Sequence, residues 1–261
     1  MIDREKVFKL LDKDIDKVTI GKALDAAELA QQKNLIKDTD FLDPYYRDTL
    51  IKVTKGLFGI KYHINGGYPG AERAKVTFYP DFLHKDDIED AISCIQVTGT
   101  FPQKYSHRDF LGSILGLGIS REKVGDIITF ESGCQVVLDN RLVDFIKLNL
   151  TKVGNINVKA KEIYPHQLEV RDIKVKKIKG TVASLRLDAV GGLGFSLSRT
   201  KLASLIKGER VKVNWKTIKN PAYMVEEGDV ISLKGKGRIS VANEGKETRK
   251  GRKHLEINRF V

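Results

Sequence analysis

The residues best suited to chemistry lie between positions 186 and 219, where cations are interspersed with small hydroxyl and amide side chains. Lysine and arginine bind phosphate groups through their charge, and serine and asparagine add neutral hydrogen bonds to the same backbone. The residues of this kind are Arg186, Ser198, Arg199, Lys201, Lys207, Lys212, Asn214, Lys216 and Lys219. This combination predicts a binding surface for a polyanion such as RNA.

A short helix is expected to position several of these side chains. The segment SRTKLASLIKG (198–208) predicts a helix with Ser198 as its N-cap, and Gly208 is expected to end it in the left-handed conformation. Apolar side chains at i, i+3 and i+4 predict one buried stripe, made of Leu202, Leu205 and Ile206. The basic side chains can then gather on one surface while the stripe faces the other way.

Strands and turns are expected to follow this helix. The alternation in VKVN (211–214) is typical of a half-buried strand, EGD (227–229) predicts a turn, and VISLKG (230–235) predicts another short strand. The glycine-rich GGLGF (191–195) is interpreted as a turn between two helices rather than as a methyl-donor site.

The order of these blocks resembles the alpha-L RNA-binding domain, which is named after ribosomal protein S-four. The blocks are RLD (186–188), SR (198–199), VKVN (211–214) and GDVI (228–231). The resemblance implies that the RNA-facing positions of that family are Arg186, Ser198, Arg199, Lys212 and Lys216 here. Trp215 departs from the glycine that many members carry, and it could stack on a base or pack.

Charge is unevenly distributed along the chain. Residues 1–150 contain 21 Lys and Arg against 23 Asp and Glu, a net charge of −2, whereas residues 151–261 contain 25 against 11, a net charge of +14. A basic half joined to a near-neutral half predicts a polyanion-binding module attached to a domain with other duties. Lys176 and Lys177 belong to a basic strand leading into the module, and KETRKGRK (246–253) is expected to be a basic turn between two strands. Both are candidate contacts to an RNA backbone.

A second group of possible RNA contacts lies in the middle of the chain. His107 and Arg108 begin a predicted helix, and Arg121 and Lys123 follow in a glycine-containing loop, so these cations could hold a phosphate backbone. Capping of the helix and salt bridging by His107 and Asp109 explain the first pair without any function. Acid–base catalysis by His107 and Asp109 would need a third converging group, which the sequence does not identify.

The order of predicted elements indicates an α+β protein with three parts. Residues 1–73 form a helical region, residues 74–164 a central α/β sandwich that resembles an RNA recognition motif, and residues 165–261 the alpha-L domain with its core at 186–235. The stretch DDIEDAI (86–92) is expected to be a short helix of the central domain. The aromatic strand signature that stacks bases in an RNA recognition motif is missing.

At full length the chain resembles the YlmH family of bacterial proteins. The resemblance rests on HRDFLG (107–112), GISREKVGDI (118–127) and the alpha-L module. It implies a non-catalytic factor that binds ribosomal RNA and tRNA on the large ribosomal subunit carrying peptidyl-tRNA. There it would assist ribosome-associated quality control, which extends the stalled chain, together with other quality-control factors. On this view, charge reversal at Arg186 and Arg199 should abolish ribosome association while leaving the fold intact.

Two other functions stay open at this point. Alpha-L modules often accompany pseudouridine synthases and methyltransferases, so an RNA-modifying enzyme is one alternative. The RLD block at 186–188 superficially resembles a pseudouridine synthase motif, but its place at the start of the alpha-L module explains it without catalysis. The other alternative is a scaffold for cell-division proteins, because the YlmH gene neighbourhood is linked to division in some bacteria.

Several classes of protein are disfavoured by the sequence. No apolar run approaches the roughly 20 residues that span a bilayer, and MIDREKVFKL lacks the apolar core of a signal peptide, so we expect a cytoplasmic protein without membrane contact. Cys94 and Cys134 are isolated in apolar segments and are expected to be buried. The loop NGGYPGAER (65–73) lacks the Gly-Lys-Ser/Thr ending of a phosphate-binding loop. We expect neither a metal nor a cofactor.

Overall fold

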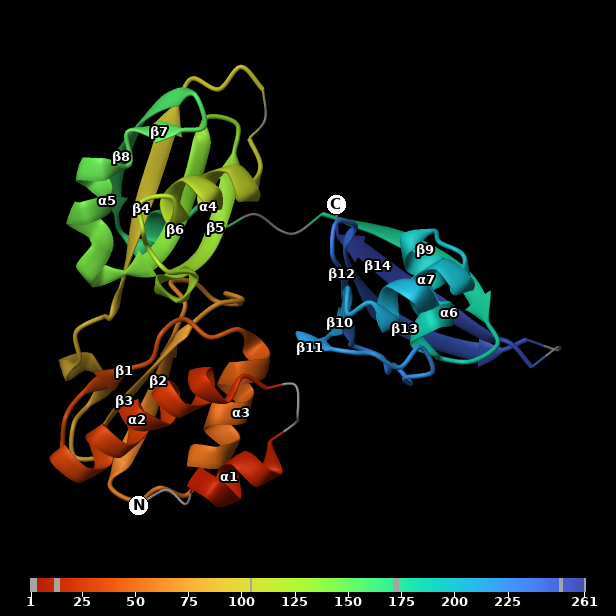
Figure 1. The fold of residues 1–261 in the computed structure, drawn as a ribbon, viewed down its shortest axis with the longest axis horizontal. Helices are drawn as coiled ribbons and strands as arrows, with labels where there is room; N and C mark the ends of the chain where they lie inside the picture. Colours follow the sequence, from red (N-terminus) through yellow and green to blue (C-terminus); the bar gives the residue numbers. More distant parts are fainter. Residues whose placement is uncertain (1–3, 12–14, 104, 171–173, 249–250, 261) are drawn as a thin grey trace. The chain divides into compact units, whose positions relative to one another are not determined.

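The computed structural model describes residues 4–11, 15–103, 105–170, 174–248 and 251–260 of the chain. It divides into two compact units, unit 1 (residues 1–170) and unit 2 (residues 171–261), as Figure 1 shows. Each of the four clusters of buried apolar residues lies within a single unit. The fold is α+β, with N-terminal helices, a central sheet and a C-terminal sheet covered by two helices. No helix of the described residues has the length and apolar character that crossing a bilayer would require.

The first part of unit 1 packs three helices against a small antiparallel sheet. The helices are α1 (Arg4–Leu10), α2 (Lys17–Lys33) and α3 (Pro44–Thr54). Aspartates begin two of them, because the side chain of Asp16 accepts from two backbone N–H groups of α2 and that of Asp43 accepts from Tyr46 N of α3. The sheet has the order β1-β3-β2, with β1 at Lys37–Asp38, β2 at Ile60–Asn65 and β3 at Lys75–Pro80.

Strand β3 shows how the sheet differs from the expected division of the chain. It was grouped with the central domain, but it pairs along its whole length with β2 and also with β1. Strand β2 lies within residues 1–73, the part predicted to be a helical region, although IKYHIN alternates apolar and polar residues as a strand does. All six residues of β3 are buried, so the strand forms the middle of this sheet.

The second part of unit 1 is a five-stranded antiparallel sheet with two helices on one face (Figure 1). Its order is β5-β6-β4-β8-β7, and the helices are α4 (His107–Leu115) and α5 (Val143–Asn149). The strands are β4 (Ile92–Gly99), β5 (Val124–Phe130), β6 (Gly133–Asp139), β7 (Lys152–Val153) and β8 (Ile156–Ile163). Strands β5 and β6 pair as an antiparallel hairpin.

The helix predicted for residues 86–92 is wrong. A single turn of 3-10 helix spans Lys85–Asp87, residues 88–91 are irregular, and β4 begins at Ile92. Acidic residues explain the early end, because Glu89 and Asp90 would stand at a helix C-terminus, where the helix dipole disfavours negative charge. Ile92 is instead buried in the sheet.

Buried polar contacts join the two parts of unit 1. Lys75 of β3 and Asp139 at the end of β6 form an ion pair at 2.6 Å, and each side chain is only 1% exposed. Burial opposes the charge on Asp139, but hydrogen bonds from Arg141 and Lys75 outweigh it and hold the pKa of this carboxyl far below its usual range. Lys123 adds a contact to Asp40 at 2.5 Å.

The two cysteines lie inside the central sheet. Cys94 on β4 and Cys134 on β6 are both buried and free, which confirms the prediction that they are buried. Burial raises the pKa of the Cys94 thiol to about 11 and raises that of Cys134 further.

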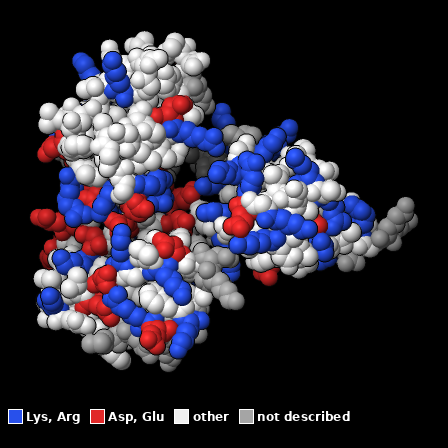
Figure 2. Space-filling view, in the orientation of Figure 1, with Lys and Arg blue, Asp and Glu red and all other residues white. Residues whose placement is uncertain are grey.

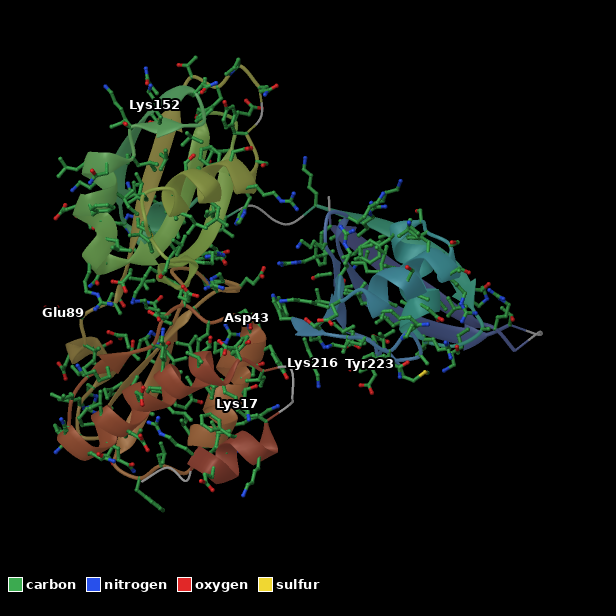
Figure 3. The ribbon with its side chains drawn as sticks, viewed as in Figure 1. Lys17, Asp43, Glu89, Lys152, Lys216 and Tyr223 are labelled. Carbon is green, nitrogen blue, oxygen red and sulfur yellow. The ribbon has the colours of Figure 1, made fainter. Side chains whose placement is uncertain are left out.

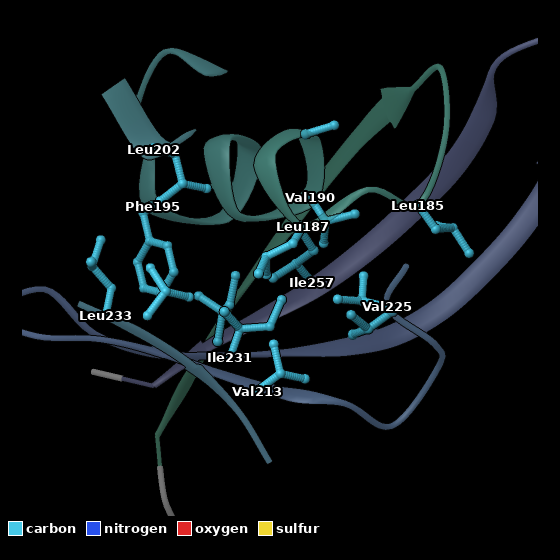
Figure 4. Packing of buried hydrophobic residues seen from close by; sticks show 14 of the residues in the cluster. Leu185, Leu187, Val190, Phe195, Leu202, Val213, Val225, Ile231, Leu233 and Ile257 are labelled. Atoms are coloured by element: carbon cyan, nitrogen blue, oxygen red, sulfur yellow. The ribbon is translucent and has the colours of Figure 1, made fainter. Parts of the chain in front are cut away.

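Unit 2 is a six-stranded antiparallel sheet with two helices on one face (Figures 1 and 4). Its order is β11-β10-β12-β13-β14-β9, and the helices are α6 (Leu187–Phe195) and α7 (Arg199–Lys207). The strands are β9 (Val175–Val182), β10 (Val211–Val213), β11 (Lys216–Thr217), β12 (Val230–Leu233), β13 (Gly237–Glu247) and β14 (Lys253–Phe260). Figure 4 shows Leu187, Leu202, Ile231 and Ile257 in the core between helices and sheet.

Helix α6 corrects the interpretation of GGLGF as a turn. These residues are helical, and the glycines allow close packing. A Cβ on Gly191 would lie 2.5 Å from Leu202 Cδ2 of α7, and one on Gly194 would lie 2.4 Å from Ile239 Cδ1 of β13. The missing side chains therefore let α6 approach both neighbours.

The end of α7 corrects a second expectation. Gly208 has a φ of −82°, and the left-handed residue is Glu209, with a φ of 58°. The backbone N–H of Arg210 donates to the carbonyl of Leu205, which closes the helix around Glu209 in a Schellman arrangement. The left-handed position thus comes one residue later than the glycine suggested.

Candidate nucleic-acid interface

An ion-pair cluster ties the two helices of unit 2 together. Arg186 is the N-cap residue of α6, Asp188 lies in the first turn of that helix, and Arg199 is the first residue of α7. Arg186 Nη2 lies 3.0 Å from Asp188 Oδ2, and Arg199 Nη2 lies 3.1 Å from Asp188 Oδ1. The Asp188 side chain is 7% exposed, whereas the two arginines are 38% and 55% exposed. Burial works to raise the pKa of Asp188, but the hydrogen bonds from both arginines hold it below its usual range.

This cluster changes what Arg186 and Arg199 can do. Each donates part of its guanidinium to a buried carboxylate, and their exposed portions stay available for a phosphate. Charge reversal at both positions would place three carboxylates together, with one of them buried. The earlier expectation that such reversal leaves the fold intact therefore does not hold for this geometry.

Three lysines offer the least restricted positive charge in the predicted set. Lys201 and Lys207 lie on the exposed side of α7, and Lys212 lies on β10. No described residue makes a hydrogen bond or ion pair with any of the three side chains. Lysine and arginine predominate over acidic residues on the visible face of unit 2 in Figure 2.

The predicted set occupies two faces of unit 2 rather than one. Leu202 and Ile206 turn α7 toward the sheet, so Lys201 and Lys207 point away from it on the helical side. Lys212 lies between Val211 and Val213, which are buried beneath the helices, so its side chain projects from the opposite face of the sheet.

Asn214 and Trp215 form a tight hairpin turn. Both have positive φ, 47° and 65°, between the paired residues Val213 and Lys216, which is typical of a type I′ turn. Asn214 Nδ2 donates to Asp229 Oδ1 at 2.7 Å, and Asn214 Oδ1 accepts from Val230 N at 2.9 Å. The Asn214 amide is thus used inside the protein, where it fixes the hairpin.

The remaining residues of the module also have internal contacts. The Arg238 guanidinium lies 5.8 Å from the centroid of the half-buried Trp215 ring, so this indole packs within the unit. Lys216 extends from β11 at one edge of the sheet (Figure 3), and Lys219 pairs with Glu209 at 3.1 Å. Ser198 Oγ accepts from Lys201 N at 3.2 Å, which confirms its predicted role as N-cap.

Sequence reasoning missed a basic group at the C-terminal end of α7. Arg210 Nη2 donates to the carbonyl of Lys234 at 3.4 Å, and the backbone N–H of Lys234 donates to the carbonyl of Arg210. The turn containing Lys234 and Lys236 therefore lies beside Arg210, and all three residues are exposed. Their separation in sequence hid this group, because only the pairing of β10 with β12 brings them together.

Of the four cations predicted as a second group of RNA contacts, two face solvent and two make contacts within the protein. His107 and Arg108 are exposed at the start of α4, whose capping box joins Ser106 and Asp109. Arg121 and Lys123 instead make contacts inside unit 1, since Arg121 donates to the carbonyls of Val124 and Gly125 and Lys123 pairs with Asp40. Burial lowers the pKa of Arg121 to about 10.

The basic strand β9 exposes Lys176 and Lys177. Lys177 and Lys179 both contact the Glu256 carboxylate of β14, at 3.1 and 3.4 Å. Lys176 is exposed and forms no ion pair with any described residue. The tip of the loop that joins β13 to β14 includes residues 249 and 250, which lie outside the described residues.

The second face of the central sheet is partly covered by the chain itself. Gln135 of β6 is 2% exposed, because its amide donates to the carbonyl of Gln167 at 3.0 Å and accepts from Glu169 N at 2.6 Å. Phe41, Tyr68 and Leu168 belong to the apolar cluster on this face. In an RNA recognition motif the corresponding face carries base-stacking aromatics, so this covering agrees with the missing aromatic signature.

The fold and basic surface of unit 2 define an RNA-binding protein of the alpha-L class. Comparison with protein families extends this assignment to most of the chain. Residues 185–231 match the family model described as "S4 domain", residues 84–167 match "Putative RNA-binding domain in YlmH", and residues 16–82 match "YlmH, N-terminal". The chain therefore belongs to the YlmH family.

Individual relatives agree with this assignment. The chain is 32% identical over 256 residues to "Ribosome-associated protein quality control protein P2" of Bacillus subtilis (strain 168), covering 97% of this chain and 98% of that protein. Over 56 residues it is 44% identical to "Small ribosomal subunit protein uS4" of Desulfotalea psychrophila, covering 21% of this chain and 27% of the relative.

A solved structure shows the same fold over part of the chain. It is titled "Cell division protein ylmH from Streptococcus pneumoniae" and aligns with a TM-score of 0.52 at 20% identity. The alignment covers 61% of this chain and 99% of that one. At this level of identity the likeness concerns the fold alone.

Proposed function

We propose that this protein is a non-catalytic factor that binds ribosomal RNA and tRNA on the large ribosomal subunit carrying peptidyl-tRNA. It would act in the cytoplasm during ribosome-associated quality control, with other quality-control factors, while the stalled chain is extended. The observation that carries this proposal is the group of exposed, unpaired lysines, Lys201, Lys207 and Lys212, on an alpha-L domain. The name of the Bacillus subtilis relative supports the pathway.

The proposed mechanism is electrostatic. Each lysine that neutralises a phosphate releases condensed counterions, so the affinity should fall steeply as salt rises. Arg186 and Arg199 are held in fixed positions by Asp188, so their exposed N–H groups can meet a phosphate without first being ordered. The hairpin at Asn214 is fixed in the same way, and a rigid basic surface suits structured RNA, which is recognised largely by shape and backbone.

The first test is reversal of charge on α7. The variant Lys201→Glu with Lys207→Glu should weaken co-sedimentation with isolated large ribosomal subunits and reduce the slope of log affinity against log salt by about two. These side chains are exposed and make no internal contacts in the described structure, so the fold should persist. The measurement is co-sedimentation over a salt series, with and without peptidyl-tRNA.

The matched control is Lys17→Glu with Lys22→Glu on α2. Both lysines are exposed on one helix of unit 1, so the net charge changes by the same amount. This control should bind subunits like the unmodified protein. If both double variants lost the same amount of subunit binding, net charge alone would explain the loss, and the assignment of the binding surface to α7 would be contradicted.

A further inference from the structure

Two phenylalanines in unit 1 are far more exposed than is usual for this residue. Phe58 is 90% exposed and Phe82 is 68% exposed. Both lie at the same end of the paired strands β2 and β3, where Ile60 pairs with Pro80 and Asp81 N donates to the carbonyl of Gly59 at 3.0 Å. One residue separates Phe58 from the start of β2 and one separates Phe82 from the end of β3, and each phenylalanine lies in a turn.

Three lysines lie near this end of the hairpin, one through a direct contact and two through their places in the chain. Lys61 Nζ donates to the carbonyl of Asp81 at 2.6 Å, which places its ammonium group next to Phe82. Lys55 is the C-cap residue of α3, three positions before Phe58. Lys33 ends α2, and the same turn contains Gln31, whose Nε2 donates to the carbonyl of Phe58 at 3.0 Å. No ion pair involves these lysines among the described residues.

Few acidic side chains lie near Phe58 and Phe82. Asp81 directly follows β3 and precedes Phe82, and Asp86 and Asp87 lie in the 3-10 turn Lys85–Asp87 further along the chain. The chain then reaches the other end of β2, where Asn65 Nδ2 donates to Asp90 Oδ1 at 2.7 Å. The immediate surroundings of Phe58 therefore hold more positive than negative charge.

We propose that Phe58 and Phe82 form a stacking site for unpaired bases of single-stranded RNA, with Lys33, Lys55 and Lys61 contacting its phosphates. Aromatic faces beside lysines are the groups with which proteins hold single strands without sequence preference. A protein partner fits less well, because the cores of protein interfaces are depleted in lysine.

The site lies outside the two matches to RNA-binding models. Phe58 and Phe82 fall within residues 16–82, which match the N-terminal YlmH model, whereas the RNA-binding models match residues 84–167 and 185–231. The proposal therefore adds a single-strand contact that the alpha-L surface does not supply. It does not depend on whether the alpha-L surface binds the ribosome.

The test uses the full chain carrying Lys201→Glu and Lys207→Glu, so that unit 2 does not mask a weaker site. Binding of a short fluorescein-labelled polyuridine RNA is measured by anisotropy at low salt. Adding Phe58→Ala and Phe82→Ala should lower the affinity about tenfold to a hundredfold, since stacking of one base contributes about 1–3 kcal/mol. A 2-aminopurine base in the same RNA should be quenched by the parent and not by this variant.

A matched control and a rescue make the result specific. Phe145→Ala with Leu148→Ala removes another exposed apolar pair, on α5, and should leave RNA affinity unchanged. Phe58→Tyr with Phe82→Tyr keeps two aromatic faces and should restore both binding and quenching. Unchanged affinity and quenching in a folded Phe58→Ala, Phe82→Ala variant would overturn the proposal, and this includes the case in which the pair binds a protein.

Discussion

At the scale of single residues, Asp188 is the group on which the geometry of the basic surface depends. Its buried carboxylate accepts from Arg186 at the start of α6 and from Arg199 at the start of α7. One acidic side chain thus sets the positions of two cations that the alpha-L resemblance assigns to RNA. The acid of the RLD block is explained by this structural role, without a catalytic one.

The depressed pKa of Asp188 makes a pH-dependent contribution to stability. A carboxyl whose pKa is lower in the folded state stabilises the fold above its unfolded pKa of about 3.9, and this contribution is lost as the pH falls through the folded value. Asp188→Asn should therefore lower the free energy of unfolding at neutral pH by about 1–2 kcal/mol. The difference from the unmodified protein should shrink below about pH 4.

Fluorescence of the single tryptophan, Trp215, measures this effect in unit 2. Urea unfolding is followed at neutral and at acidic pH for both proteins. A deficit in Asp188→Asn that is equally large at both pH values would show that the ionised carboxylate is not the stabilising species. Glu209→Gln serves as the control, because Glu209 pairs with Lys219 on an exposed part of the same unit.

Sequence motifs could identify the cations of unit 2 but not what they contact. Arg186 and Arg199 stood out by type and spacing, whereas their common partner depends on how α6 meets α7. Lys123 illustrates the same limit, because it pairs with Asp40, which is 83 positions away. A loop lysine whose partner is distant in sequence has no local pattern that separates it from a lysine that faces solvent.

At the scale of elements, the packing of α6 depends on glycines that local propensity would exclude from a helix. Gly194 faces Ile239 and Ile257 of the sheet, and any Cβ at this position would enter their space. Glycine costs about 0.5–1 kcal/mol in a helix interior, and burial of α6 against the sheet outweighs that cost. This explains why a stretch that favours a turn by composition is helical here.

Alanine substitutions should separate glycines that permit packing from glycines that merely weaken a helix. Gly194→Ala places a Cβ 2.4 Å from Ile239 Cδ1 and should destabilise unit 2 by about 1–3 kcal/mol through overpacking. Gly112→Ala in α4 meets nothing within 4 Å and should stabilise unit 1 by about 0.5–1 kcal/mol.

Thermal unfolding followed by circular dichroism and by Trp215 fluorescence reads out both substitutions. Opposite shifts in the two variants support the packing argument. If Gly194→Ala were as stable as the unmodified protein, the close approach of α6 to β13 would not require glycine.

The elements that sequence patterns predicted well are those with strong local signals. A Ser cap and an apolar stripe indicated α7, and the alternation in VKVN indicated β10. Patterns failed where long-range pairing decides the outcome. The apolar residues of 86–92 indicated a helix, but Ile92 begins β4, where it pairs with Asp139 of β6.

At the scale of the whole molecule, the chain consists of two units with separate apolar cores. The ion pair between Lys75 and Asp139 is buried within unit 1 and links its two sheets. Loss of this ion pair should not destabilise the core of unit 2, since no cluster of described buried residues includes members from both units.

Lys75→Met tests this independence. The substitution leaves Asp139 buried with Arg141 at 2.7 Å and Lys123 at 3.8 Å as its remaining cationic partners, so unit 1 should lose about 3 kcal/mol of stability. The transition seen by circular dichroism should move to lower temperature, while the unfolding transition of Trp215 in unit 2 stays in place. A matching shift of the Trp215 transition would show that the two units unfold together.

The buried cysteines also decide how the molecule can be labelled. Alkylating dyes react with thiolates, and Cys94 and Cys134 are protonated and shielded at neutral pH because burial raises the pKa of both. These are the only cysteines of the chain. One cysteine introduced on either unit would therefore present the single reactive thiol of the folded protein, and a fluorophore could be attached there without removing either native cysteine.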